Sequence, residues 1–371
     1  MRLADLDLSD LRFRTSADVA PAIRAACDAN PDLATCEAIG ESEAGRPILG
    51  VTLGTGPRVV TLVAGAHADE PVGPETLRTL ILEGLAARDW GAADGGLSDL
   101  LTRVTCRIIP HVNPDGEARN RPWIGAWDDR DVAGTLRAFL QHRRREPPGR
   151  DVEFGFPAMR VENRDATAFL FDGGPIALHA SLHGMAFSEG SLVLVERRWL
   201  GTPPADALVR DWLATAAQAG LRPHDHDRHG DKGFVYGGRG VWSTPEGRAM
   251  RAHFIDAGDP ETAAGFHLSS MESAVDRGAD GERTPLCLVP EVPRFVIGTG
   301  RAPTPGVASH LAAFMDDLPA MQLAAERGDP LDTFVNRHAV RCVPLPDAVR
   351  LHLRLLDLGL RAAGAVATSP S

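Results

Sequence analysis

The sequence predicts an α/β fold, with a single domain whose mostly parallel or mixed central sheet is flanked by helices. Two observations carry this prediction. Short apolar runs of strand length alternate with longer segments of helical periodicity, which is the pattern of strand–helix–strand units. In addition, no internal repeat and no clean linker divides the 371 residues, so one domain over 1–371 is the simplest organisation.

The elements follow in order along the chain. A helix with a stop at Asn30-Pro31 opens the chain, and the stretch "CEAIGESEAGRPILGVTLG" predicts two strands around a turn. Four later apolar runs predict buried strands, because each is short and continuous. The predicted strands are 58–66, 103–113, 176–183 and 285–292, and the predicted helices are 17–29, 74–89, 131–146, 205–220 and 347–363.

Composition narrows the class of protein. The formal net charge of −11 argues against nucleic acid as a partner. The N-terminus "MRLADLDLSDLRF" lacks the apolar core of a signal peptide, and no apolar run reaches membrane-spanning length. The five cysteines are widely spaced without a CxxC pair, so neither a disulfide framework nor a zinc knuckle is expected. We expect a cytoplasmic protein with reduced thiols and no membrane partner.

Each of the four predicted strands runs into a polar cluster at its carboxyl end. The first gives His67 and Glu70, the second gives "HVNPDG" from His111, the third gives His183, and the fourth gives Glu291. In open α/β sheets the ligand site lies outside the carboxyl ends of the strands. These side chains are therefore expected to converge on one cleft.

The residue types suit a catalytic zinc ion. Such an ion takes three protein ligands and leaves a position for water. His67 and Glu70 are three residues apart and can reach one ion, and His183 is the best third ligand. His179 competes with it but lies deeper in the strand. Glu291 is placed to take a proton from the water and to deliver it to a leaving amine.

An ordered set of motifs carries a family resemblance. These motifs are "IGESEAGRPI", "HADE", "NPDG", "ENRD", "SLHG" and "LVPE". With them the chain resembles the zinc metallocarboxypeptidases of the carboxypeptidase A type. The resemblance covers about residues 36–295, which we expect to form the core, with a C-terminal helical extension at about 305–365.

The resemblance assigns roles to individual residues. It implies that His67, Glu70 and His183 bind one zinc ion per chain and that Glu291 is the general base. Asn163 and Arg164 resemble the pair that grips the substrate's terminal carboxylate, for which arginine's planar fork is suited.

An arginine after "NPDG" should stabilise the oxyanion. Arg121 is favoured for this role over Arg119, because its spacing is nearer that of the family.

The sequence departs from the family in three places. The digestive members have an arginine inside the HxxE motif, where this chain has Asp69. They also close the site with a tyrosine, but the single tyrosine here, Tyr236, lies farther from Glu291 than the family pattern suggests. Finally, residues 186–283 match poorly, and the family builds its substrate pockets there.

The function that the resemblance implies is that of a zinc-dependent carboxypeptidase. Its substrate would be a peptide or an acyl-amino acid with a free carboxylate, cleaved at a C-terminal peptide bond. One alternative is a zinc amidohydrolase or deacylase that acts on N-acyl amino acids or cell-wall peptides. Another is a catalytically silent binding protein on the same fold. No feature of the sequence indicates an oligomeric state.

Overall fold

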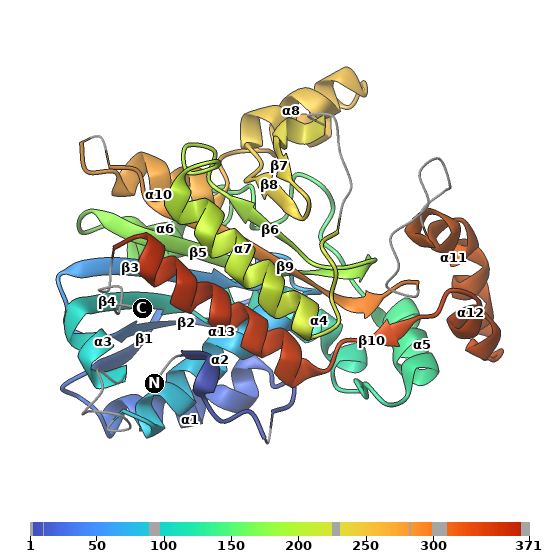
Figure 1. Ribbon diagram of the computed structural model, residues 1–371, viewed down its shortest axis with the longest axis horizontal. Helices are drawn as coiled ribbons and strands as arrows, with labels where there is room; N and C mark the ends of the chain where they lie inside the picture. The colour runs from blue at the N-terminus through green and yellow to red at the C-terminus, as the bar shows by residue number, and fades with distance from the viewer. Residues whose placement is uncertain are drawn as a thin grey trace.

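The computed structural model describes residues 3–9, 11–88, 97–224, 231–281, 283–298 and 310–364. All strands in this part of the chain form one ten-stranded sheet (Figure 1). Its spatial order is β1-β2-β4-β3-β5-β9-β6-β8-β7, and β10 pairs with β9. The strands are β1 (Ala34–Glu41), β2 (Pro47–Leu53), β3 (Arg58–Ala64), β4 (Val104–Ile109), β5 (Ile176–Ser188), β6 (Leu192–Val195), β7 (Tyr236–Gly238), β8 (Val241–Ser243), β9 (Leu286–Val296) and β10 (Arg341–Cys342).

The sheet is mixed. The central pairs β3–β4, β3–β5 and β5–β9 are parallel. The pairs β1–β2, β2–β4 and β6–β9 are antiparallel. This confirms the predicted fold class, and it places the carboxyl ends of the central strands at one edge.

Helices cover both faces of the sheet (Figure 1). One hydrophobic cluster joins the sheet to α1, α2, α7 and α13, a second joins it to α6 and α10, and a third gathers α4, α5 and α11 beyond the end of β9. The helices are η1 (Leu3–Asp5), α1 (Ser16–Asp28), α2 (Val72–Ala86), α3 (Leu97–Arg103), α4 (Pro114–Ile124), α5 (Val132–His142), α6 (Val161–Phe171), α7 (Pro203–Gln218), η3 (Asp231–Gly233), α8 (Gly247–Asp256), α9 (Pro260–Ala264), α10 (Ser270–Gly278), α11 (His310–Arg327), α12 (Asp332–Arg337) and α13 (Leu345–Ala362).

The strands β5 and β9 are longer than the sequence pattern predicts. Both continue past the residues expected to end them. Phe187 of β5 and Phe295 of β9 are paired partners whose ring centroids lie 5.4 Å apart, so ring packing stabilises the added length. His183 and Glu291, expected at strand ends, therefore lie within paired strands.

The short strands β6, β7 and β8 were not predicted. They contain three or four residues each, too few to show an apolar run or an alternation in the sequence. They extend the sheet beyond β9, in the region that matches the family motifs poorly.

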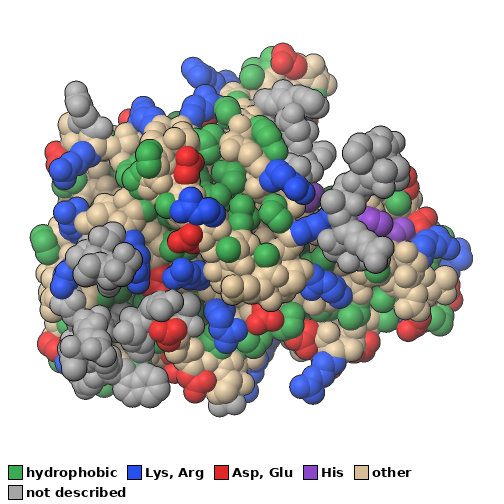
Figure 2. All heavy atoms as spheres, in the orientation of Figure 1, with side chains coloured by type: hydrophobic (Ala, Val, Ile, Leu, Met, Phe, Trp, Pro, Cys, Tyr) green, Lys and Arg blue, Asp and Glu red, His purple; other side chains and the backbone are tan. Residues whose placement is uncertain are grey.

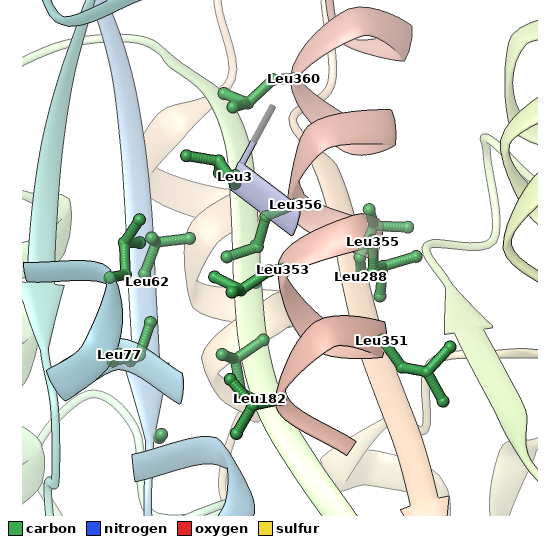
Figure 3. Packing of buried hydrophobic residues seen from close by; sticks show 14 of the residues in the cluster. Leu3, Leu62, Leu77, Leu182, Leu288, Leu351, Leu353, Leu355, Leu356 and Leu360 are labelled. Atoms are coloured by element: carbon green, nitrogen blue, oxygen red, sulfur yellow. The ribbon is translucent and has the colours of Figure 1, made fainter. Parts of the chain in front are cut away.

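The C-terminal helix α13 is part of the main core and not an extension of it. Its leucines pack toward Leu62 of β3, Leu182 of β5 and Leu288 of β9 (Figure 3). Leu353 and Leu356 on this helix are almost fully buried. The core therefore reaches beyond the expected residues 36–295.

The surface carries charges of both signs. On the face shown in Figure 2, acidic and basic side chains are interspersed with hydrophobic ones. Among the described residues, no helix is both long and apolar enough to cross a membrane.

A truncation inside α13 tests its place in the core. Leu353 is 0% exposed, so Leu353→Ala should lower the free energy of unfolding by about 2–5 kcal/mol through lost burial and a cavity. The control Leu323→Ala, at a position 46% exposed on α11, should change it by less than about 0.5 kcal/mol. Urea unfolding measures both. Equal, small effects would show that α13 does not contribute to the core.

Candidate metal centre

The first two candidate ligands lie in the turn between β3 and α2. Gly65 opens this turn with a φ of +77°, and a Cβ there would lie 2.4 Å from the His111 ring, so only glycine fits. The backbone N–H of Glu70 donates to the carbonyl of His67 at 3.1 Å. The two side chains meet on one side of the turn, with His67 Nδ1 3.2 Å from Glu70 Oε1.

His183 of β5 completes the group. Its Nδ1 lies 3.0 Å from Glu70 Oε2 and 3.2 Å from His67 Nδ1. Gly73 in the first turn of α2 permits this approach, because a Cβ there would lie 2.2 Å from the carbonyl oxygen of Leu182. The ligand atoms of the three residues all lie within 4.8 Å of one another.

This donor set suits a zinc ion. Two imidazole nitrogens and one carboxylate oxygen are a usual ligand set of catalytic zinc sites, which keep a fourth position open for water. Across the described ranges, no other group of three histidine, cysteine or acidic side chains converges in this way. The residues present therefore fit the metal that the resemblance implies.

The three ligands influence one another electrostatically. Burial lowers the pKa of His67, but the Glu70 carboxylate outweighs burial and raises that pKa to about 9. Burial raises the pKa of Glu70, yet His67 and His183 hold it well below its usual range. Metal ligands must be deprotonated, so the binding of a divalent ion here would release protons.

Glu291 lies beside His183 on the neighbouring strand. The two residues are paired partners in the parallel ladder of β5 and β9, so their side chains leave the sheet on the same face. Glu291 is partly buried and does not belong to the three-ligand group. A carboxylate thus lies next to the candidate ion site without being one of its ligands.

Two residues contact the other side of the His183 ring, and one of them, Glu153, was not singled out from the sequence. Ser181 Oγ lies 2.8 Å and Glu153 Oε2 lies 3.1 Å from His183 Nε2. The only sequence signal for Glu153 is an acidic residue in the otherwise apolar run "VEFGFP", where it is 3% exposed.

The predicted carboxylate clamp is not at this site. Arg164 has a side chain that is 64% exposed, and its Nε donates to Asp165 at 2.7 Å. Asp165 lies against Gly40 of β1. That edge strand is four positions from β5 in the sheet, or about 19 Å at a spacing of about 4.8 Å. The structure therefore places Arg164 away from the three candidate ligands.

Asn163 is buried and turned inward. Its Nδ2 donates to the carbonyl of Val152 at 2.8 Å. It therefore holds the backbone next to Glu153, and it does not face the three ligands. The dipeptide match "NR" could not reveal this, because consecutive residues on a helix point in different directions.

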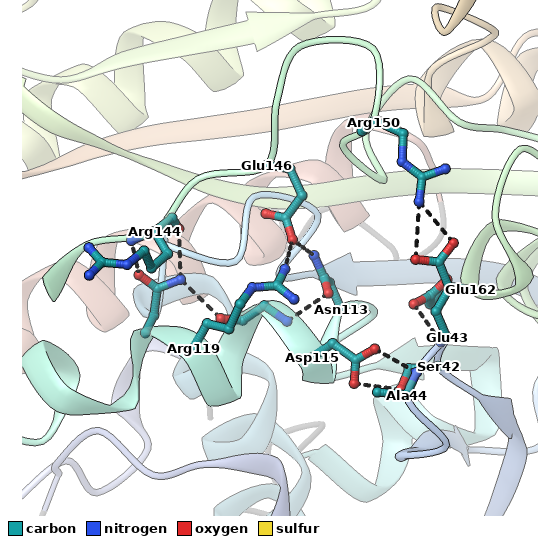
Figure 4. A network of polar contacts seen from close by, with 12 residues as sticks. Ser42, Glu43, Ala44, Asn113, Asp115, Arg119, Arg144, Glu146, Arg150 and Glu162 are labelled. Atoms are coloured by element: carbon teal, nitrogen blue, oxygen red, sulfur yellow. Dashed lines mark hydrogen bonds and ion pairs between the residues drawn. The ribbon is translucent and has the colours of Figure 1, made fainter.

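Neither arginine after "NPDG" reaches the ligands. Arg121 is 68% exposed on α4, and its Nη2 lies 4.0 Å from Asp18 of α1. The structure thus places Arg121 at the surface, beside α1. Arg119 forms an ion pair with Glu146, which also accepts a hydrogen bond from Asn113 Nδ2 at 2.9 Å (Figure 4). Arg119 thus ties the start of α4 to the segment after α5.

Two other arginines lie close to the HxxE turn. Asp69 Oδ2 accepts a hydrogen bond from Arg143 Nε at 2.6 Å and lies 3.9 Å from Arg294 Nη2. Burial lowers the pKa of Arg294 to about 10, although Asp69 opposes this. Asp69 stands at the position where the digestive members of the family have an arginine, and it lies close to two guanidinium groups.

The other residues considered in the sequence are His179, His111 and Tyr236. His179 is buried, with Nδ1 2.8 Å from Thr61 Oγ1, and burial lowers its pKa to about 3. His111 Nδ1 accepts the Asn113 N–H at 3.1 Å and so supports the turn before α4. Tyr236 lies on the edge strand β7 and is 43% exposed.

Comparison with known proteins bears on the first part of the chain. Residues 21–186 match the family described as zinc carboxypeptidase. The family resemblance is thereby confirmed over this stretch. The zinc carboxypeptidase stretch contains His67, Glu70 and His183, whereas Glu291 lies outside it. No curated protein matches the chain.

Solved structures of low sequence identity also align with the chain. A carboxypeptidase A from Helicoverpa armigera is 16% identical with a TM-score of 0.46, over 96% of this chain and 74% of that chain. A metallo-carboxypeptidase from Burkholderia cenocepacia is 20% identical with a TM-score of 0.42, over 83% of this chain and 67% of that chain.

The positions of Arg121 and Arg164 lead to a direct prediction. Both guanidinium groups are exposed, and they pair with Asp18 and Asp165, so Arg121→Ala and Arg164→Ala should each leave kcat/KM within about threefold of wild type. The measurement is steady-state kinetics on any peptide that the wild type hydrolyses. A drop of a hundredfold or more in either variant would restore that arginine to the site.

Proposed function

We propose that this protein is a zinc-dependent metallopeptidase that hydrolyses a peptide bond near a chain end. The observation that carries the proposal is the convergence of His67, Glu70 and His183 with Glu291 on the adjacent strand. The zinc carboxypeptidase match over residues 21–186 supports the choice of metal and of reaction class.

Each residue has a chemical task in this proposal. His67, Glu70 and His183 hold the ion. When bound, zinc supplies Lewis acidity that lowers the pKa of a coordinated water toward about 7 and polarises a carbonyl. Glu291 accepts a proton from the water and passes it to the amine that leaves. Glu291 is partly buried beside His183, which suits a group that must exchange protons with both the water and the leaving amine.

A second candidate is a zinc amidohydrolase or deacylase on N-acyl amino acids or cell-wall peptides. The observation that favours it is the exposed position of Arg164, which takes the expected carboxylate clamp away from the ligands. If the protein is a peptidase, Arg143 is a candidate for recognising the substrate carboxylate, because its guanidinium is partly exposed and contacts Asp69 of the HxxE turn.

Substitution of the base separates hydrolysis from binding. Glu291→Gln keeps the shape of the side chain but cannot accept a proton, so kcat should fall by about 10²–10⁴-fold while zinc stays bound. Glu37→Gln, an exposed glutamate on β1, is the matched control and should keep full activity. Activity and zinc content are measured on the same samples. Full activity in Glu291→Gln would remove the base from the proposal.

A pair of substrates tests the type of hydrolysis. Peptides of one sequence with a free or an amidated C-terminus differ only in the terminal carboxylate. A carboxypeptidase cleaves the first and spares the second, whereas cleavage of both, or of N-acyl amino acids alone, supports the second candidate. If the metal-loaded protein binds these compounds and cleaves none, the catalytically silent reading of the fold is supported.

A further inference from the structure

The Glu153 carboxylate is unusual among the buried acidic groups of this protein. Glu75, Glu117 and Glu162 are each buried, and each forms an ion pair with an arginine. Glu153 is as deeply buried, but among the described residues His183 is its one hydrogen-bond partner, through Oε2. Its Oε1 has no hydrogen-bond partner in that part of the chain.

A buried carboxylate with so little compensation requires positive charge nearby. The His183 ring lies between Glu153 and the candidate ion site. Its Nε2 faces Glu153 at 3.1 Å, and its Nδ1 faces Glu70 and His67 at 3.0 Å and 3.2 Å. Nε2 is therefore directed at the Glu153 carboxylate and at Ser181 Oγ, which lies 2.8 Å away, and Nδ1 is directed at the candidate ion site.

The backbone around Glu153 is held on both sides. Val152 accepts a hydrogen bond from Asn163 Nδ2 at 2.8 Å, and the Phe154 carbonyl accepts one from the His267 N–H at 2.8 Å. A side chain fixed in this way keeps its carboxylate against one ring nitrogen. Such carboxylate–histidine–metal arrangements orient the ring and raise its basicity as a ligand.

We propose that Glu153 is a positioning residue that holds His183 with Nε2 protonated and Nδ1 free for the metal, and that its charge strengthens metal binding. This rests on the proposed function, because it takes His183 to be a ligand. A bound divalent ion would in turn place positive charge on the far side of the His183 ring from the buried Glu153.

The test is the zinc dissociation constant, measured by competition with a chromophoric chelator at pH 7. Glu153→Gln keeps the shape and an oxygen that accepts the Nε2–H, but it removes the charge. Zinc binding should weaken about 10–100-fold. The matched control is Glu117→Gln, which removes a buried carboxylate that lies 3.8 Å from His111, a histidine outside the ligand group. Its zinc affinity should stay within about threefold of wild type.

A second readout separates positioning from general stability. Melting temperatures are measured without metal and with zinc at one fixed concentration. In Glu153→Gln the zinc-induced increase should shrink, whereas a purely structural role would lower both temperatures equally. If Glu153→Gln does not fold, Glu153→Asp carries the test, because it withdraws the carboxylate from Nε2 and should weaken zinc binding at least severalfold.

The outcomes are distinct. Wild-type zinc affinity in the folded Glu153 variants would overturn the role of Glu153 and leave the proposed function intact. Failure of the wild type to bind zinc would overturn both.

Discussion

The parallel alignment of β3, β5 and β9 decides where the three candidate ligands and Glu291 lie. Because the three strands run side by side in one direction, the turn after β3 faces the extended part of β5, and β5 in turn faces β9. The HxxE turn, His183 and Glu291 meet for that reason. Two glycines make the meeting close, one at the start of the turn and one in the first turn of α2.

Charge balance is the second constraint on this region. Glu70 and Glu153 are both buried or nearly so, and both contact His183. Elsewhere in the fold, several buried carboxylates are paired with arginines, as Glu117 is with Arg78. Here the pairing is with histidines, whose charge a divalent ion can replace. A buried carboxylate needs positive charge beside it. Among the helices this charge comes from arginine salt bridges, and at the carboxyl ends of the central strands a bound cation would supply it.

Sequence reasoning predicted what depends on strands and short motifs. The pattern of apolar runs predicts the four central strands, and the spacing of His67 and Glu70 predicts that both side chains can reach one ion. The sequence did not predict the directions in which side chains point. The dipeptide Asn163-Arg164 matches a motif, but its helix turns Asn163 inward and leaves Arg164 exposed.

Contacts between residues far apart in the chain could not be predicted from the sequence either. Glu153 contacts a histidine thirty residues away, and no periodicity or motif marks that contact. The C-terminal segment is predicted as an amphipathic helical extension, because its sequence does not show which strands the helix covers. Only the packing of α13 on β3, β5 and β9 reveals it as core.

The most direct measurement is the metal content of the purified protein by elemental analysis, beside His67→Ala and His183→Ala, after excess zinc has been offered and removed. We expect about one zinc ion per chain in the wild type and none in either variant, because a catalytic zinc ion needs three protein ligands. No bound metal in the wild type, or equal amounts in all three proteins, would contradict it.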